Sequence, residues 1–290
     1  MSDAAFTPVI IIGAGRSGTN ILRDILTSLP DFATWECDEI NPIWRHGNIN
    51  WPNDELSAEH ATPKVKAFIQ KAFRKIWQQQ GQPSYIVEKT CANSLRVPFV
   101  DAVLPNAIFI YIVRDGVDVL ASASKRWKGD LELPGFTYFL SKARYTPLVD
   151  LPRYGMSFLR SRLGLVFGNS QRLAVWGPRF TGMDDNKEAS LTELCARQWA
   201  ACVDMSDAAF EKINSARVIK IQYEDFVTNP HETLGLILDR LIVQVPESVL
   251  AEATVNVRTT SVGKGRQAFE DQLPKPILQL MASTMKRHGY

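Results

Sequence analysis

The sequence predicts an α/β protein in which helices cover both faces of a central, mainly parallel sheet. Three short apolar runs, 8–12, 108–113 and 218–221, lack the polar and apolar alternation of a half-exposed strand, so we expect them to be buried strands. Segments with the 3.6-residue period of amphipathic helices separate these runs. Strands that alternate with helices along a chain are typical of parallel sheets.

Each element follows from its local pattern. A glycine-rich turn after 8–12 leads into helical spacing over 21–29, and an apolar stripe predicts a helix over 65–77 that Gly81 and Pro83 end. The other expected elements are a strand at 85–87, helices at about 95–104, 117–126 and 191–214, a helix at 233–241 after Asn229-Pro230, and a C-terminal helical segment. We expect residues 1–290 to form a single domain.

The stretch 128–186 interrupts this rhythm and is expected to be an insertion. It is rich in Pro and Gly and is locally basic, with Asp150 as the one acid between 133 and 183. Its cationic residues over that range are Lys142, Arg144, Arg153, Arg160, Arg162, Arg172 and Arg179. Two interpretations remain open: a solvated surface or subunit contact, or a lid that binds an anionic or sugar-like acceptor.

Composition excludes several classes of partner. The 33 basic and 31 acidic residues give a net charge of +2, too small to favour nucleic acid or an anionic membrane. The apolar runs are shorter than the ~20 residues of a membrane span, and the N-terminus lacks a signal-peptide pattern. The four cysteines and four histidines have no metal-ligand spacing. We expect a cytoplasmic protein with a small-molecule ligand and no protein-held metal; the oligomeric state is not readable.

The glycine-rich turn Gly13–Asn20 predicts an anion site, because it joins a strand to a helix N-terminus. Nucleoside-triphosphate chemistry fits poorly, since Thr19 stands where the phosphate-binding motif has lysine. A literal GxGxxG match, with Glu36 near the position of a ribose-binding acid, makes a Rossmann-type dinucleotide-dependent oxidoreductase the alternative. The bulk of Arg16 between the glycines counts against that alternative.

Four separated motifs resemble the sulfotransferases that use 3′-phosphoadenosine 5′-phosphosulfate (PAPS). The run Arg16-Ser17-Gly18-Thr19-Asn20 resembles their 5′-phosphosulfate loop, with Asn20 as a mild departure, and Arg114 followed by Ser122 resembles their 3′-phosphate site. Glu88-Lys89-Thr90 and the run 223–230 resemble further family segments. The resemblance covers most of 8–127 and 218–266. It implies a P-loop-kinase-like three-layer fold and PAPS as co-substrate, released as 3′-phosphoadenosine 5′-phosphate (PAP), without a metal.

The transferred group requires donors aimed at its oxygens before reaction. The donors expected at the helix start are Gly15, Arg16, Ser17, Gly18, Thr19 and Asn20. Lys89 follows the strand at 85–87 and would reach the same ligand from the carboxyl edge of the sheet, to neutralise the leaving phosphate. An ion pair with Glu88, or exposure to solvent, is the alternative for Lys89.

The 3′-phosphate is expected to contact Arg114, whose planar fork suits phosphate, and the hydroxyl of Ser122 two helical turns later. The alternative for Arg114 is an ion pair with Asp115 or Asp118.

A basic run near the C-terminus, Gly263-Lys264-Gly265-Arg266, resembles the family's flexible loop that closes over the 3′-phosphate. A plain surface turn is the alternative. Tyr223 either stacks near the adenine or packs beside its strand.

An acceptor hydroxyl must lose a proton as it attacks sulfur, so a general base is required. Glu36 lies twenty residues after Arg16, which matches the glutamate spacing of the carbohydrate and tyrosylprotein-type branch. His46 and His60 lack such a context, and a surface carboxylate is the alternative for Glu36. We therefore expect a small-molecule or glycan hydroxyl acceptor, a carbohydrate or other alcohol before a tyrosine or phenol.

Overall fold

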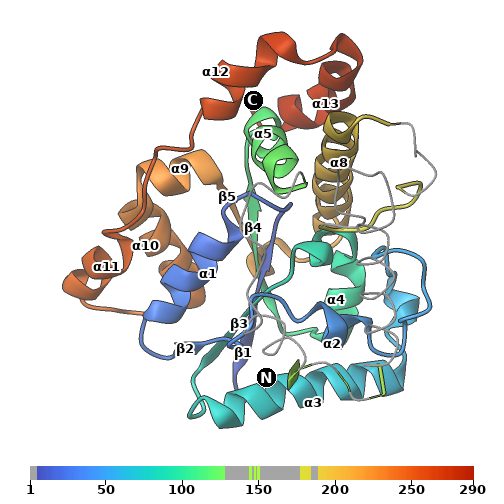
Figure 1. Ribbon diagram of the computed structural model, residues 1–290. Helices are drawn as coiled ribbons and strands as arrows, with labels where there is room; N and C mark the ends of the chain where they lie inside the picture. Colours follow the sequence, from blue (N-terminus) through green and yellow to red (C-terminus); the bar gives the residue numbers. More distant parts are fainter. Residues whose placement is uncertain (1–4, 128–143, 146, 148, 151–176, 184–188) are drawn as a thin grey trace.

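The computed structural model describes residues 5–127, 144–145, 147, 149–150, 177–183 and 189–290 of the chain. Most of the expected insertion at 128–186 therefore lies outside the described residues. In the described ranges, a parallel sheet separates two groups of helices (Figure 1). The predicted α/β fold with a central parallel sheet is confirmed.

The sheet has five strands in the order β2-β3-β1-β4-β5, and every neighbouring pair is parallel. The strands are β1 (Thr7–Ile12), β2 (Phe32–Ala33), β3 (Tyr85–Lys89), β4 (Ile108–Val113) and β5 (Val218–Gln222). Ile11 of β1 pairs with Lys89 on one side and Ile110 on the other. Because parallel strands end at the same edge, the turn after β1, Lys89 and Arg114 share the carboxyl edge of the sheet.

Helices cover both faces and create two cores. Val9 and Ile11 pack into one core, and Ile10 and Ile12 into the other, as alternation along a strand requires. Helices of the first face are α1 (Thr19–Ser28), α9 (Tyr223–Thr228), α10 (Pro230–Leu241) and α11 (Glu247–Thr254). Helices of the second face are α3 (Pro63–Gln79), α4 (Val97–Val103), α5 (Gly116–Trp127), α8 (Leu191–Phe210) and α13 (Lys275–Arg287). Burial on both faces explains why the strands read as continuous apolar runs.

The shorter elements depart from the sequence expectations. The helix expected at about 95–104 is α4, which begins two residues later, and a 3-10 turn, η2 (Cys91–Leu95), precedes it with Arg96 between the two. The helix expected at 191–214 ends at Phe210. Strand β2 has two residues, too few for a sequence pattern. Two further short helices are α2 (Asn41–Arg45) and α12 (Lys264–Phe269).

None of the helices in the described ranges combines the length and hydropathy that crossing a membrane requires.

The second core depends on Phe73, which is fully buried on α3 and meets the edges of two tryptophan rings. Its ring centroid lies 4.7 Å from that of Trp35 and 5.8 Å from that of Trp44. We expect Phe73→Ala to lower the free energy of unfolding by about 3–5 kcal/mol, because it leaves a cavity among these rings. Leu236→Ala, at an exposed position on α10, is the control, with an expected change within about 0.5 kcal/mol. Equal changes in urea denaturation would refute the assignment.

Candidate active site

The loop between β1 and α1 makes a tight turn at the carboxyl edge of the sheet. Gly18 precedes α1 with a φ of +84°, and a Cβ atom there would lie 2.4 Å from the ring of Tyr223. Arg16 also has a positive φ, 73°, which costs free energy for a residue with a side chain. The first N–H groups of α1 have no acceptor within the helix, and the helix dipole favours negative charge there. The turn therefore offers backbone donors and a favourable dipole to a negatively charged ligand.

The side chains of this loop add polar groups to the site. The hydroxyl of Ser17 is buried and has no hydrogen-bond partner among the described residues. An unpaired buried hydroxyl costs about 1–3 kcal/mol, which a polar ligand in the loop would relieve. The Thr19 hydroxyl lies 3.9 Å from the Cys91 sulfur, and Asn20 is exposed in the first turn of α1. The loop thus fits an anionic ligand with several acceptor oxygens.

Arg114, directly after β4, joins the loop to two distant segments. Its Nη1 donates to the backbone oxygen of Arg16 at 3.0 Å, and its Nη2 donates to that of Ser261 at 2.7 Å. The guanidinium carbon lies 4.3 Å from the ring centroid of Tyr223. Arg16 in turn donates from Nε to the Ser122 hydroxyl at 2.9 Å. Arg16 from one motif and Arg114 and Ser122 from another therefore form one connected group.

Tyr223 is nearly fully buried beneath this group. Its ring contacts the position of Gly18 and the guanidinium of Arg114, and its hydroxyl lies 2.7 Å from the Ser261 hydroxyl. These contacts correspond to one of the two expectations for Tyr223, namely that it packs beside its strand.

The basic segment at 263–266 lies against α5 through Asp118. The Asp118 carboxylate accepts backbone N–H groups of Gly263 at 2.7 Å and Gly265 at 2.6 Å, and lies 3.5 Å from Arg114 Nη2. The Arg266 guanidinium forms an ion pair with Asp115. The alternative expected for Arg114, a pair with Asp118, is thus present alongside its other contacts. A plain surface turn does not describe this segment, although the Lys264 side chain is exposed.

Lys89 ends β3 and is surrounded by carboxylates. Its side chain is 1% exposed, and Nζ lies 3.0 Å from Asp38 Oδ1 and 3.2 Å from Glu39 Oε1. Neither solvent exposure nor a pair with Glu88 describes it, because consecutive strand residues point to opposite faces. Burial opposes the charge, but the nearby carboxylates outweigh it and raise the pKa of Lys89 above its usual value. Lys89 is a fixed cation at the carboxyl edge.

Asp38 also receives a second cation. Burial disfavours its charge, but Lys89 and Arg23 together hold the pKa of the Asp38 carboxyl below its usual value. Arg23 Nη1 reaches Asp38 Oδ1 at 2.7 Å from helix α1.

Glu36 lies in the loop between β2 and α2, the loop that also carries Asp38 and Glu39. Its side chain is 58% exposed and accepts from Arg144 Nη1 at 3.0 Å and from the Tyr145 hydroxyl at 3.4 Å. Both partners belong to the expected insertion. Glu36, the expected base, therefore pairs with Arg144, whereas Asp38 and Glu39 contact Lys89.

Glu88 is a buried carboxyl to which the sequence analysis gave no role of its own. It is 1% exposed and accepts hydrogen bonds from the Thr90 hydroxyl and from Asn93 Nδ2. Burial raises the pKa of Glu88 to about 7, although the Thr90 hydrogen bond and the charge of Arg96 oppose the shift. In the sequence, Glu88 was marked only as a member of the motif Glu88-Lys89-Thr90.

Other contacts of the site had weaker sequence signals. Asp38 and Glu39 belong to a run of acids after β2, and Asp118 lies one turn after Arg114. Ser261 had no signal, because its backbone oxygen makes the contact with Arg114. Within the described ranges, no group of three or more His, Cys, Asp or Glu side chains is arranged to hold a metal ion.

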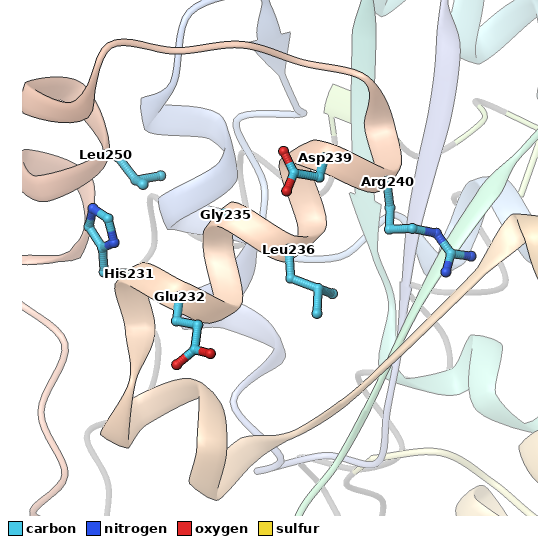
Figure 2. Close-up of a pocket in the computed structure, with 7 residues that line it drawn as sticks. All are labelled: His231, Glu232, Gly235, Leu236, Asp239, Arg240 and Leu250. Atoms are coloured by element: carbon cyan, nitrogen blue, oxygen red, sulfur yellow. The ribbon is translucent and has the colours of Figure 1, made fainter.

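Figure 2 shows a shallow pocket on the outer surface of α10, away from this site. It is lined by His231, Glu232, Gly235, Leu236, Asp239, Arg240 and Leu250. None of the residues predicted for catalysis or anion binding lines it, so it is a separate surface feature.

Comparisons with known proteins give a family and a shared fold. A family model described as "Sulfotransferase family" matches residues 8–161. The sulfotransferase domain from the curacin biosynthetic pathway is similar in fold, with 15% identity, 98% of both chains covered and a TM-score of 0.58. The sulfotransferase domain of the olefin synthase from Synechococcus PCC 7002 has 15% identity, 100% of this chain and 97% of that chain covered, and a TM-score of 0.57. No curated protein matches the sequence.

A third similar structure is the sulfotransferase STF9 from Mycobacterium avium. It has 11% identity, 98% of this chain and 77% of that chain covered, and a TM-score of 0.55. At such low identity these three structures establish the shared fold.

The Glu88 carboxyl makes stability depend on pH. Its pKa rises from about 4.5 in the unfolded chain to about 7 in the folded protein, so between these values unfolding releases a proton. The stability of the wild type relative to Glu88→Gln should therefore fall by about 3 kcal/mol as pH rises from about 4.5 to 7, and then stay level. Urea denaturation of both proteins across this range measures the difference, because their other groups cancel. A difference independent of pH would contradict the raised pKa.

Proposed function

Because the chain belongs to the sulfotransferase family, we propose that it transfers a sulfuryl group from PAPS to the hydroxyl of an acceptor. The observation that carries this proposal is the connected group of Arg16, Arg114 and Ser122 beside the turn after β1. Two separate motifs meet there, at the carboxyl edge where ligands of open parallel sheets bind. We further propose that residues 1–290 form a single sulfotransferase domain.

The described residues fit the two anionic ends of PAPS. The turn from Gly15 to Asn20, with the buried Ser17 hydroxyl, would hold the 5′-phosphosulfate. Arg114 and Ser122 would hold the 3′-phosphate, with Lys264, Gly265 and Arg266 closing the site. Because the N–H groups of Gly263, Gly265 and Arg266 already donate to Asp118, the side chains of that segment and the Lys264 N–H would contact the phosphate. Tyr223 would support Arg114 from below.

In the proposed reaction, the acceptor oxygen forms a bond to sulfur while the bond from sulfur to the 5′-phosphate oxygen breaks. Glu36 takes the acceptor's proton, and PAP leaves with the additional negative charge on its 5′-phosphate. Arg16 and Lys89 stabilise that charge, which grows in the transition state. Lys89 suits the role because its ion pairs hold it charged and in place without a metal.

The acceptor we propose is a carbohydrate or another alcohol, with a tyrosine or phenol as the next candidate. The glutamate spacing of the carbohydrate and tyrosylprotein-type branch supports this choice. The contacts of Glu36 with Arg144 and Tyr145 also support it, because they bring the base beside the basic insertion. An aromatic ring and a guanidinium there suit a polar or anionic acceptor.

The topology argues against the oxidoreductase alternative. In a dinucleotide-binding fold the second strand lies beside the first, in the order 3-2-1-4-5-6. Here β1 lies between β3 and β4, and β2 is at the edge. The GxGxxG match is therefore a match of spacing without the corresponding strand order.

Calorimetric titration with PAP, AMP, ATP and NAD tests the proposed function. We expect PAP to bind at micromolar concentration and AMP at least about tenfold more weakly, because AMP lacks the 3′-phosphate that Arg114 would contact. Binding of NAD or ATP without binding of PAP would refute the proposal.

Arg114→Ala should weaken PAP binding by about 10- to 100-fold and AMP binding far less, since it removes charged hydrogen bonds to the 3′-phosphate. Arg197→Ala is a matched control, because Arg197 pairs with Glu193 on α8 and should leave both affinities unchanged. Equal weakening for PAP and AMP would remove the 3′-phosphate role from Arg114.

Glu36→Gln should lower turnover at least about 100-fold while PAP affinity stays within about twofold, because it removes the proton acceptor and little else. Release of PAP from PAPS in the presence of a panel of sugars, alcohols and 4-nitrophenol measures turnover. Asp38→Asn is the companion variant. Full activity in Glu36→Gln with loss in Asp38→Asn would transfer the base role to the carboxylate beside Lys89.

A further inference from the structure

The side chain of Glu88 begins two hydrogen-bonded relays on the face of the sheet opposite to Lys89. In the first, the Thr90 hydroxyl donates to Glu88 Oε1 and accepts the backbone N–H of Ile40 at 3.2 Å. The Thr90 side chain is fully buried, so this relay is shielded from water. The relay ends on the backbone of the loop between β2 and α2.

The second relay reaches the next residue of that loop. Asn93 Nδ2 donates to Glu88 Oε2 at 2.9 Å, and Asn93 Oδ1 accepts from Arg96 Nε at 2.8 Å. Arg96 Nη2 then donates to Asn41 Oδ1 at 2.6 Å. One carboxyl group is thus connected, by two separate routes, to two consecutive residues.

The loop that both relays reach carries the acids of the candidate active site. It runs from Glu36 to Asn41 and includes Asp38 and Glu39, which contact Lys89. Glu39 Oε1 also accepts the backbone N–H of Cys91 at 3.2 Å. The position of this loop relative to β3 therefore sets the distances between Lys89 and its carboxylates.

We propose that Glu88 is a positioning residue that fixes the loop 36–41 over the end of β3, and through it the acids around Lys89. The link to catalysis rests on the proposed function, whereas the link to the loop rests on the hydrogen bonds. Burial of a carboxyl costs more free energy than an apolar side chain of similar size would. A group that served packing alone would gain nothing from this cost.

The charged groups around Glu88 come from several elements. Arg96 lies on the same side and also faces Asp54 at 3.6 Å, which is paired with Arg45. Glu39 acts on Glu88 from the loop and raises the pKa of Glu88, while Arg96 lowers it. Because the pKa of Glu88 lies at about 7, its charge changes near neutral pH, and with it the strength of the hydrogen bonds that Thr90 and Asn93 donate to it.

Amide hydrogen exchange of the full-length protein, read by mass spectrometry, tests the inference. Thr90→Val removes the oxygen that accepts the Ile40 N–H and keeps the shape of the side chain. We expect exchange over 37–41 to accelerate about tenfold or more, and exchange over 22–28 of α1 to stay unchanged. Thr90→Ser keeps a hydroxyl and should restore the wild-type rate.

Thr284→Val is the matched control. Thr284 is buried on α13 and its hydroxyl donates to Asp204 of α8 at 2.7 Å, far from the loop 36–41 in the sequence. Its removal should leave exchange over 37–41 unchanged. Wild-type protection of 37–41, corrected for intrinsic exchange, should change near pH 7, and Glu88→Gln should abolish that change. Unchanged exchange over 37–41 in Thr90→Val, equal acceleration in Thr284→Val, or no pH step would each overturn the inference.

The proposed function fails or stands separately from this inference. PAP titration of Thr90→Val should give the wild-type dissociation constant within about twofold, because the Thr90 hydroxyl bonds Glu88 and Ile40 and none of the groups proposed to hold PAP. Absence of PAP binding in the wild type would refute the proposed donor and leave the exchange result intact.

Discussion

The close approach of the Tyr223 ring to Gly18 is the constraint on which the site depends. A side chain at position 18 would collide with the ring, and the φ of +84° already favours glycine. The ring in turn supports the Arg114 guanidinium and bonds Ser261. Three segments far apart in sequence, the turn after β1, the end of β4 and the segment at 261–266, are therefore joined through one aromatic side chain. A looser turn would separate them.

The cations of the candidate active site are each paired with a carboxylate of the protein. Lys89 has Asp38 and Glu39, Arg114 has Asp118, and Arg266 has Asp115. Each internal carboxylate lowers the cost of burying its cation, but it also competes for the charge that a phosphate would use. Arg114 is held partly by backbone carbonyl oxygens, which carry no net charge and therefore neutralise less of its positive charge than a second carboxylate would.

Local patterns predicted the sheet and the motif residues, and long-range contacts account for what they missed. The strand 108–113 is almost entirely buried, and 218–221 is buried except at Lys220, so their apolar sequences indicate strands directly. Arg114 and Ser122 were singled out by the resemblance of their motif, an arginine at a strand end with a serine eight positions later, to the sulfotransferase 3′-phosphate site. The roles of Asp118 and Glu88 depend on Gly265 and Ile40, which are remote in sequence. The helix expected at about 95–104 begins only at Val97, after Arg96, whose buried side chain donates to Asn41 and Asn93.

The attachment of the 263–266 segment to Asp118 determines which of its positions can change during evolution. Asp118 binds this segment through backbone N–H groups, which every residue except proline supplies. The exposed side chain at 264 can therefore vary during evolution without loss of the attachment. Position 265 cannot vary in this way, because a Cβ atom there would lie 2.6 Å from the Asp118 backbone. Among relatives of this protein, an acid at 118 and a glycine at 265 should be inherited together, while the charge of the side chain at 264 changes with the ligand.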